Sequence, residues 1–273
     1  MSASSLSAAQ RVAIARDPNR PGVQDYISNL FTDFFPLKGD RLCGEDASIL
    51  GGIARFHGQP VTVIGTRKGK NLNENLAYNF GMPNPEGYRK ALRLMKQAEK
   101  FGRPIFTFVD TPGAYPGLEA EAHGQGEAIA RNLLEMSRLT VPVIAVILGE
   151  GNSGGALALA VANRVLMLEH AVYSVLSPEG FASILWKDAA RSAEACEMMK
   201  LTSQDLLALG VIDDIIPEPK DGAHTAPEIA YRRMDAALTR HLAELNKESK
   251  IALTSSRYQK FRRMGTVPIQ SGK

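Results

Sequence analysis

The stretch from Gly149 to Ala156 holds the residues whose types and spacing are best suited to chemistry. It reads Gly-Glu-Gly-Asn-Ser-Gly-Gly-Ala, with four glycines among its first seven residues. An apolar run of strand length, residues 141–148, precedes it, and small apolar residues, 156–162, follow it. This order predicts a strand, a glycine turn and the start of a helix. Glycines expose the backbone, and the first N–H groups of a helix have no acceptor within the helix. Such a turn therefore favours a phosphate, a carboxylate or a developing oxyanion.

Several known motifs match these letters in part. The pattern G-x-G-x-x-G, from Gly149 to Gly154, fits a dinucleotide fingerprint, and Glu169 follows where a ribose-binding acid is expected. The pattern G-x-S-x-G, centred on Ser153, fits a nucleophile elbow. A P-loop is excluded, because residues 156 and 157 are Ala and Leu rather than Lys and Ser or Thr. A glycine turn that only packs in a core remains an open alternative.

The elements that must position this stretch follow from hydrophobic periodicity and turn residues. Residues 79–87 form a turn-rich block that we expect to be non-helical, and residues 111–117 form a second loop rich in glycine and proline. We expect helices at 10–20, 23–35, 88–101 and 125–139, a hairpin of strands 48–56 and 60–65, and further strands at 104–110, 141–148, 164–168 and 172–176.

Strands and helices that alternate with glycine loops favour a parallel α/β sheet. Because sites in such sheets lie at the carboxyl ends of the strands, loops 111–117 and 149–155 should meet at one edge. Residues 177–180 should then form a third wall. The helix after the glycine turn spans only about nine residues, which is short for the crossover of a dinucleotide-binding fold.

A Ser153 hydrolase would need a histidine base. The chain has five histidines, and none has a motif context that marks it as that base. Ser153 can equally be the N-cap of the following helix. The histidines are His57, His123, His170, His224 and His241.

Length and composition set the broad class. A chain of 273 residues with 44% hydrophobic content can bury a large core in one or two domains. No apolar run approaches the roughly 18 residues of a membrane span, and the N-terminus lacks the apolar region of a secretory signal. We therefore expect a soluble cytoplasmic protein without membrane contact. Two cysteines, Cys43 and Cys196, provide neither a disulfide framework nor zinc-ligand spacing, and we expect both to be buried.

Positive charge gathers in two places. Residues 247–273 hold seven basic residues and one acid, with Arg257 and Lys260 interleaved with aromatic side chains. A solvated or partner-docking terminus is favoured there over a nucleic-acid contact. The segment 67–70, Arg-Lys-Gly-Lys, is either an anion site at a strand end or a solvated loop.

Five motifs, each weak alone, together resemble one family. The resemblance is to the carboxyltransferase α subunit of bacterial multi-subunit acetyl-CoA carboxylase, and it runs from about Ala9 to Arg263. The motifs are Gly-Gly-Ile-Ala-Arg at 51–55, Asn79–Met82 continuing with Pro85–Arg93, Asp110–Gly117, Gly149–Ala156, and Ser177–Trp186.

The resemblance implies a fold and a reaction. The fold is an α/β crotonase/ClpP-like spiral of βαβ units with flanking helices. The expected organisation is an N-terminal helical segment (1–45), a carboxyltransferase domain (46–246) and a basic C-terminal tail (247–273). The expected reaction transfers the carboxyl group of carboxybiotin to acetyl-CoA, which gives malonyl-CoA in the first committed step of fatty-acid synthesis.

The resemblance also implies partners. The chain pairs with a carboxyltransferase β subunit, usually as α₂β₂, and works with the biotin carboxyl carrier protein and biotin carboxylase. It binds no cofactor or metal itself, because carboxybiotin is a co-substrate on the carrier and a Cys₄ zinc ribbon belongs to the β subunit. Typical members carry a long helical N-terminal extension that embraces the partner, whereas the match here begins almost at Met1. The resemblance therefore implies the core chemistry but does not by itself imply that mode of subunit contact.

Site residues carry over by motif match. The backbone N–H groups of Gly154 and Gly155 form an oxyanion hole for the ureido oxygen of biotin. Two alternatives stay open, a Ser153-dependent hydrolase of the same superfold and a non-catalytic acyl-CoA-binding subunit. The expected substrate-binding residues are Gly113, Ala114, Tyr115, Pro116, Gly117, Gly151, Ser153, Glu179 and Gly180.

Overall fold

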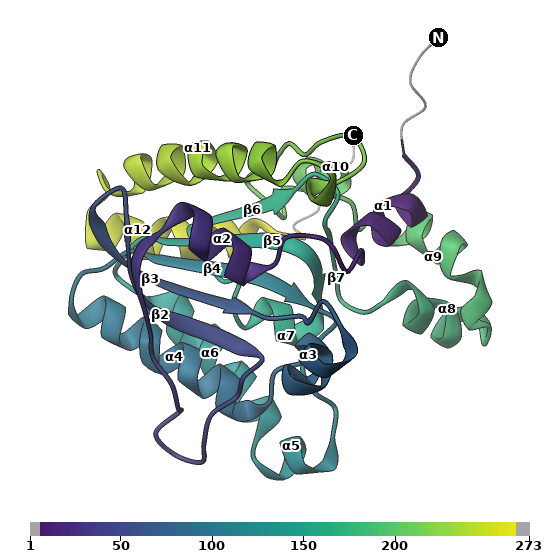
Figure 1. Cartoon of the computed structure of the whole chain (residues 1–273), viewed down its shortest axis with the longest axis horizontal. Coiled ribbons are helices and arrows are strands. Elements are labelled where there is room, and N and C mark those ends of the chain that lie inside the picture. The colour runs from purple at the N-terminus through teal and green to yellow at the C-terminus, as the bar shows by residue number, and fades with distance from the viewer. Residues whose placement is uncertain (1–5, 266–273) are drawn as a thin grey trace, which may run out of the picture.

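Two apolar segments, β4 (Ile105–Thr111) and β5 (Val143–Asn152), form the middle of an eight-stranded sheet (Figure 1). Every residue of both strands is buried, as expected for central parallel strands that are covered on both faces. The arrangement is that of a computed structural model of the chain, which describes residues 6–265.

The sheet is mixed, with the order β1-β2-β3-β4-β5-β6-β8. Strands β1, β2 and β3 pair antiparallel, and β2 and β3 form the predicted hairpin. From β3 to β8 the pairing is parallel, and β7 pairs with the end of β5, over Glu150–Asn152. The remaining strands are β1 (Thr32–Pro36), β2 (Ile49–Phe56), β3 (Gln59–Thr66), β6 (Arg164–Leu168), β7 (Val172–Ser174) and β8 (Asp214–Ile216).

Helices cover both faces of the sheet (Figure 1). On one side α4 (Pro85–Lys100) packs on β2, β3 and α6 (Gln125–Arg138), and α12 (Lys250–Arg263) contacts α6. On the other side α2 (Val23–Leu30) packs on β2, β3 and β4, and α11 (Pro227–Leu245) contacts α2. The shorter helices are α3 (Leu72–Ala77), α5 (Leu118–Ala122), α7 (Ser153–Leu157) and α10 (Ser203–Ala208), with 3₁₀ turns at Asn79–Gly81, Ala189–Arg191 and Ala223–Thr225.

Three helices form an arm beside the sheet (Figure 1). Helix α1 (Ala8–Ala15) packs against α9 (Ser192–Met199), and α9 packs against α8 (Pro178–Trp186). A small apolar cluster joins α1 and α9 to β7, separate from the main core. Its buried members are Ala8, Val12, Ala15, Val172, Cys196 and Leu201.

The predicted α/β class is confirmed, but three local predictions are wrong. The helix expected over 23–35 ends at Leu30, and residues 32–36 form β1, because β-branched and aromatic residues there favour pairing with β2. Within the block 79–87, expected to be non-helical, a 3₁₀ turn forms and α4 begins at Pro85, a residue that suits a first helical turn. Cys43 is exposed rather than buried.

The C-terminal basic segment is not a free tail over its described part. Residues 250–263 form α12, and the guanidinium of Arg257 is buried. It donates to the carbonyl oxygens of Met136 and Leu139 at 2.8 and 2.7 Å, at the end of α6. Residues 266–273, and the N-terminal residues 1–5, lie outside the described residues, and the predicted division at residues 45 and 246 stays a prediction. Among residues 6–265, no helix is long and apolar enough to cross a membrane.

Candidate functional site

The predicted glycine turn is tighter than expected. Strand β5 continues through Gly149 and Gly151 to Asn152, and α7 begins at Ser153 and has only five residues. The chain turns at Ser153 itself, whose φ of 59° lies in the left-handed region. Asn152 is the N-cap and makes no side-chain cap bond, so the N-cap role considered for Ser153 is wrong. An exposed serine at positive φ, directly after a strand, marks a backbone held in a strained conformation.

Two of the glycines are explained by packing. A Cβ at Gly149 would come within 2.6 Å of Oδ1 of Asp110, and one at Gly155 would overlap the backbone of the Gly113–Ala114 loop. The loops after β4 and β5 therefore meet at one sheet edge, as the sequence predicts. At Gly154, by contrast, a Cβ would meet only the side chain of Ile129, at 3.4 Å. Close packing therefore does not explain the glycine at position 154, which is half-buried.

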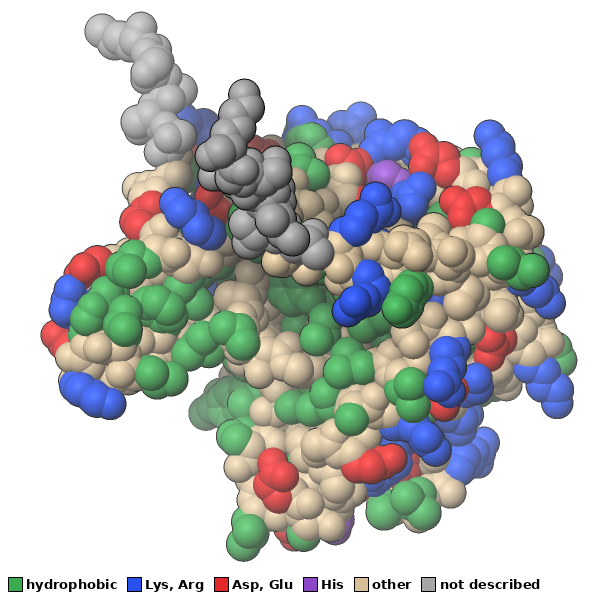
Figure 2. Space-filling model, turned by 180° about the vertical axis from the view of Figure 1, so that it is seen from behind, with side chains coloured by type: hydrophobic (Ala, Val, Ile, Leu, Met, Phe, Trp, Pro, Cys, Tyr) green, Lys and Arg blue, Asp and Glu red, His purple; other side chains and the backbone are tan. Residues whose placement is uncertain are grey.

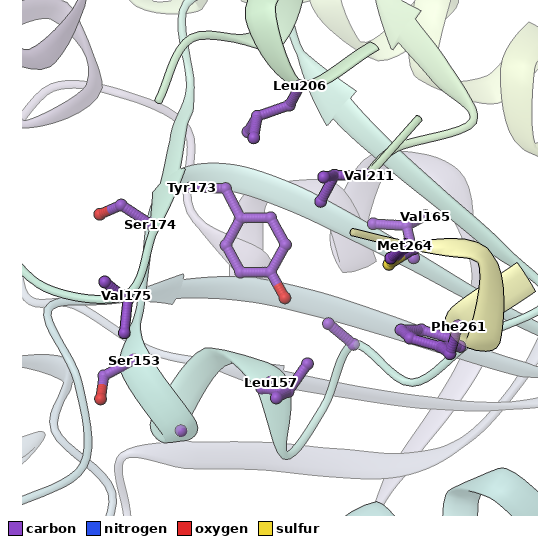
Figure 3. A pocket seen from close by; sticks show the side chains of 12 residues that line it. Ser153, Leu157, Val165, Tyr173, Ser174, Val175, Leu206, Val211, Phe261 and Met264 are labelled. Atoms are coloured by element: carbon purple, nitrogen blue, oxygen red, sulfur yellow. The ribbon is translucent and has the colours of Figure 1, made fainter. Parts of the chain in front are cut away.

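An apolar cavity of about 430 Å³ opens beside the turn (Figure 3). Ser153 and Gly154 form part of its wall, and strand β7 contributes Tyr173. Hydrophobic side chains make up most of the remainder. N–H groups at a helix start act more strongly on a ligand in apolar surroundings than in bulk water. The other lining residues are Leu157, Ala160, Val165, Ser174, Val175, Leu206, Val211, Phe261 and Met264.

Charged side chains that the sequence analysis did not connect fix the end of β5. Nζ of Lys68 lies 2.9 Å from Oδ1 of Asp110 and 2.7 Å from Oε2 of Glu150. The backbone N–H of Glu150 also donates to Oδ1 of Asp110, at 3.0 Å. On the other side of the Glu150 carboxylate, Nε of Arg16 donates to Oε1 at 2.8 Å. These bonds join three strand ends to α1, only a few residues before Gly154.

The same network keeps Glu150 ionised. Burial alone would raise the pKa of Glu150, but the charges of Lys68 and Arg16, with their hydrogen bonds, outweigh it and lower the pKa. Lys68 therefore does not serve as a free anion-binding cation. The neighbouring cations are engaged as well, because Arg67 donates to the carbonyl oxygen of Ala47 at 2.7 Å and Lys70 pairs with Asp25 at 2.9 Å.

Other predicted site residues lie apart from the cavity. Glu179 forms a forked pair with Arg16, at 2.7 and 3.2 Å, and the N–H of Gly180 donates to the Ser177 hydroxyl that caps α8. The predicted third wall is instead formed by the residues of and just after β7, such as Val175. In loop 111–117, Tyr115 donates its N–H to the carbonyl oxygen of Pro83. Ala114 is half-buried, Pro116 is exposed, and Gly117 is the N-cap of α5.

No histidine is hydrogen-bonded to Ser153 among residues 6–265. Each histidine has another partner: His57 with Asp235, His123 with Glu86, His170 with Arg11, His224 with Asp17, and His241 with Asp214.

One group of side chains within residues 6–265 has ligand atoms close enough for a metal ion. The ligand atoms of Asp40, Cys43 and Glu86 lie within 4.8 Å of one another. The guanidinium of Arg89, however, donates to Asp40 at 2.8 Å and to Glu86 at 2.9 Å. Both carboxylates are therefore already paired with the positive charge of Arg89, and this group does not suit a metal cation.

Comparison with known families follows the motifs. The sequence profile described as "Acetyl co-enzyme A carboxylase carboxyltransferase-like" matches residues 2–265. The chain belongs to this family. It is 59% identical over 260 residues to the acetyl-coenzyme A carboxylase carboxyl transferase subunit alpha of Anoxybacillus flavithermus, over 95% of this chain and 80% of that protein. The subunit of the same name from Geobacter metallireducens is 58% identical over 259 residues, over 95% and 81% of the two chains.

Solved structures support the fold of this family member. Transcarboxylase 12S, solved with methylmalonyl-coenzyme A, superposes with a TM-score of 0.67 at 22% identity, over 88% of this chain and 45% of that one. The β subunit of P. aeruginosa geranyl-CoA carboxylase gives a TM-score of 0.64 at 15% identity, over 88% and 46%. The chain thus spans less than half of each of these larger chains. The predicted crotonase-like fold is confirmed.

Proposed function

We propose that this chain is the α subunit of an acetyl-CoA carboxylase carboxyltransferase. It transfers the carboxyl group of carboxybiotin, held on a biotin carboxyl carrier protein, to acetyl-CoA and so gives malonyl-CoA. The observation that carries the proposal is the identity of close to 60% to subunits of that name along 95% of this chain. The turn at Ser153 and Gly154, which lines an apolar cavity, supports the proposal because its N–H groups would supply the chemistry that this reaction requires.

The backbone at the start of α7 would stabilise the leaving biotin. When the N–CO₂ bond of carboxybiotin breaks, negative charge develops on the ureido oxygen. The N–H groups of Gly154 and Gly155 have no acceptor within α7, and the strained turn holds them in place without any titrating side chain. Losing one donor of this kind typically costs about 10²–10³ in turnover. Residues 113–117, of which Gly113 and Ala114 pack against Gly155, would border the same site, and Gly151 would support it from β5.

The chain would supply only one half of the active site. Figure 2 shows hydrophobic side chains on the projecting arm and in the hollow between the arm and the body. Exposed members near the cavity and on the arm include Val175 (73%), Ile184 (68%) and Leu185 (54%). An exposed apolar surface beside a site marks a partner interface. We assign it to a β subunit with a zinc ribbon, in an α₂β₂ assembly that also works with biotin carboxylase in the cytoplasm.

Reconstitution tests this proposal. The purified chain is mixed with a zinc-containing β subunit, and malonyl-CoA-dependent carboxylation of free biotin is measured for each protein alone and for the mixture. We expect turnover from the mixture only. Robust turnover by this chain alone would contradict the shared site, and no turnover from a well-assembled mixture would favour a non-catalytic subunit.

Substitution of Ser153 separates the carboxyltransferase from the hydrolase alternative. Ser153→Ala removes a hydroxyl that caps nothing, so we expect at least a tenth of the carboxyl-transfer activity to remain. Loss of a nucleophile would instead lower the rate by several orders of magnitude. The rate is measured on assembled enzyme, and a decrease beyond a thousandfold in a folded variant would support the hydrolase.

A further inference from the structure

The hydroxyl of Tyr173 is the unusual group in the cavity beside Gly154. Among residues 6–265 it has no hydrogen-bond partner, and its oxygen is not one of the fully buried unpartnered atoms, so it is open to the cavity. Figure 3 shows its ring in the middle of the lining side chains, with the hydroxyl turned toward the side where Leu157 and Phe261 lie. A phenol in apolar surroundings normally finds a hydrogen-bond partner.

The other polar side chains of the cavity do not share this property. The Ser174 hydroxyl donates to the carbonyl oxygen of Leu176 at 2.6 Å and lies 3.0 Å from Oδ1 of Asn152. Ser153 is exposed to solvent, so water can satisfy its hydroxyl. Tyr173 and Ser153 thus both have a hydroxyl that no protein group uses, but the Ser153 hydroxyl turns away from the other lining side chains and that of Tyr173 lies among them (Figure 3).

The fold holds the Tyr173 ring in a fixed place. Its backbone N–H donates to the carbonyl oxygen of Leu201 at 3.1 Å, and its Cα pairs with Gly151 in the β5–β7 register. A Cβ at Gly151 would lie only 3.0 Å from Cδ2 of Tyr173. The ring thus lies directly over Gly151, three residues before Gly154. This contact gives Gly151 a physical role that the motif alone does not explain.

The phenol is a neutral donor at every pH at which the enzyme would be assayed. Burial raises the pKa of Tyr173 to about 12, because the phenolate is poorly solvated in the cavity. A neutral hydroxyl among apolar walls suits an uncharged, largely apolar ring that carries a carbonyl-type acceptor. The bicyclic ring of biotin, with its ureido carbonyl and thioether, has that chemistry.

We propose that the Tyr173 hydroxyl donates a hydrogen bond to the biotin ring as it enters this cavity, so that Tyr173 determines the affinity for biotin rather than the affinity for the acyl-CoA. This inference rests on the proposed function, because it places biotin on the Gly154 side of the site. One hydrogen bond contributes about 0.5–1.5 kcal/mol, which corresponds to roughly 2- to 12-fold in affinity.

The test uses Tyr173→Phe in the assembled enzyme, because Phe keeps the ring and removes only the hydroxyl. We expect the KM for free biotin to rise about 3- to 10-fold, the KM for malonyl-CoA to stay within twofold, and the effect to be the same at pH 6 and pH 9. Tyr231→Phe is the matched control. Tyr231 is also half-buried and lines a different cavity, of about 540 Å³ between α2 and α11, so its variant should change neither KM.

Each other outcome contradicts the inference in its own way. An unchanged KM for biotin in a folded, assembled variant would show that Tyr173 serves packing alone. A rise in the KM for malonyl-CoA instead would show that the cavity binds the acyl group rather than biotin. If the wild-type assembly itself shows no biotin-dependent turnover, the proposed function fails rather than the role of Tyr173.

Discussion

At Ser153 the chain passes from a strand to a helix within one residue, and the neighbouring glycines divide two tasks between them. Gly155 is needed for close packing, because its Cα faces the Gly113–Ala114 backbone, with the hydroxyl of Tyr88 2.8 Å from where a Cβ would lie. Gly154 has room for a Cβ and lines the cavity. The paired glycines of the motif therefore do not have equivalent roles, and the difference can be measured.

We expect Gly155→Ala to destabilise the fold far more than Gly154→Ala does. A Cβ at Gly155 must displace backbone, which costs about 1–3 kcal/mol or more, whereas the Gly154 variant should change the free energy of unfolding by less than about 1 kcal/mol. Chemical denaturation of the two variants gives both numbers. Equal destabilisation would show that the loop after β4 is not packed on Gly155.

The hydrogen bonds to the Asp40 carboxylate make the stability of the fold depend on pH, and they determine the direction of that dependence. Its buried carboxylate accepts hydrogen bonds from Nε of Arg89 and from the backbone N–H groups of residues 42–44. Burial alone would raise the pKa of Asp40, but these bonds outweigh it and lower the pKa from 3.8 to about 2. A lowered pKa in the folded state stabilises the fold above the unfolded pKa, and this stabilisation is lost as pH falls toward 2.

Asp40→Asn should therefore destabilise the fold at pH 6 by on the order of 1–3 kcal/mol, and by less at pH 3. Urea denaturation of both proteins at the two pH values gives the difference in free energy of unfolding. A difference that stays constant from pH 6 to pH 3 would mean that the Asp40 carboxylate is not selectively stabilised in its ionised form.

Among the helices and strands, the sequence predicts those whose hydrophobic pattern extends along the whole element. The strands β2 to β6 and the helices α4 and α6 were predictable, because unbroken apolar runs and 3.6-residue spacing extend over whole elements. Strand β1 was not, since only its non-local pairing with β2 distinguishes residues 32–36 from a continued helix. The sequence predicts that β5 ends at residue 148, because glycine is typical of turns. In the structure Gly149 and Gly151 lie within the strand, where neighbouring side chains leave little room for a Cβ.

The charged network shows the same limit at the site. Lys68 and Glu150 are 82 residues apart, and Asp110 and Glu150 are 40 apart, so no local pattern joins them. A weak signal existed, because acidic residues at the ends of two neighbouring parallel strands must meet at one edge. Glu179 was placed in the site by its motif, yet its carboxylate binds Arg16 and so ties α8 to α1.

At the scale of the whole molecule, the arm and the body have different roles. The body positions the turn at Ser153, and the arm of α1, α8 and α9 is tied to the body by Arg16, which bridges Glu150 and Glu179. Exposed apolar side chains lie on α8 and beside the cavity. We therefore propose that the chain is the biotin-facing half of the enzyme, that its exposed apolar surface binds a partner subunit, and that its catalytic groups are backbone N–H groups rather than side chains.

Replacement of the Gly154 amide by an ester in the assembled α/β enzyme isolates the contribution of this N–H group, because it removes the N–H and adds no side chain. The matched control is the same replacement at Gly126, which occupies the second position of α6 as Gly154 does in α7. We expect biotin-dependent turnover to fall about 10²–10³-fold at Gly154, with a control loss of less than threefold and unchanged acyl-CoA affinity. Turnover that falls equally for both esters, or only in proportion to the loss of folded, assembled protein, would show that the Gly154 N–H does not stabilise the oxyanion.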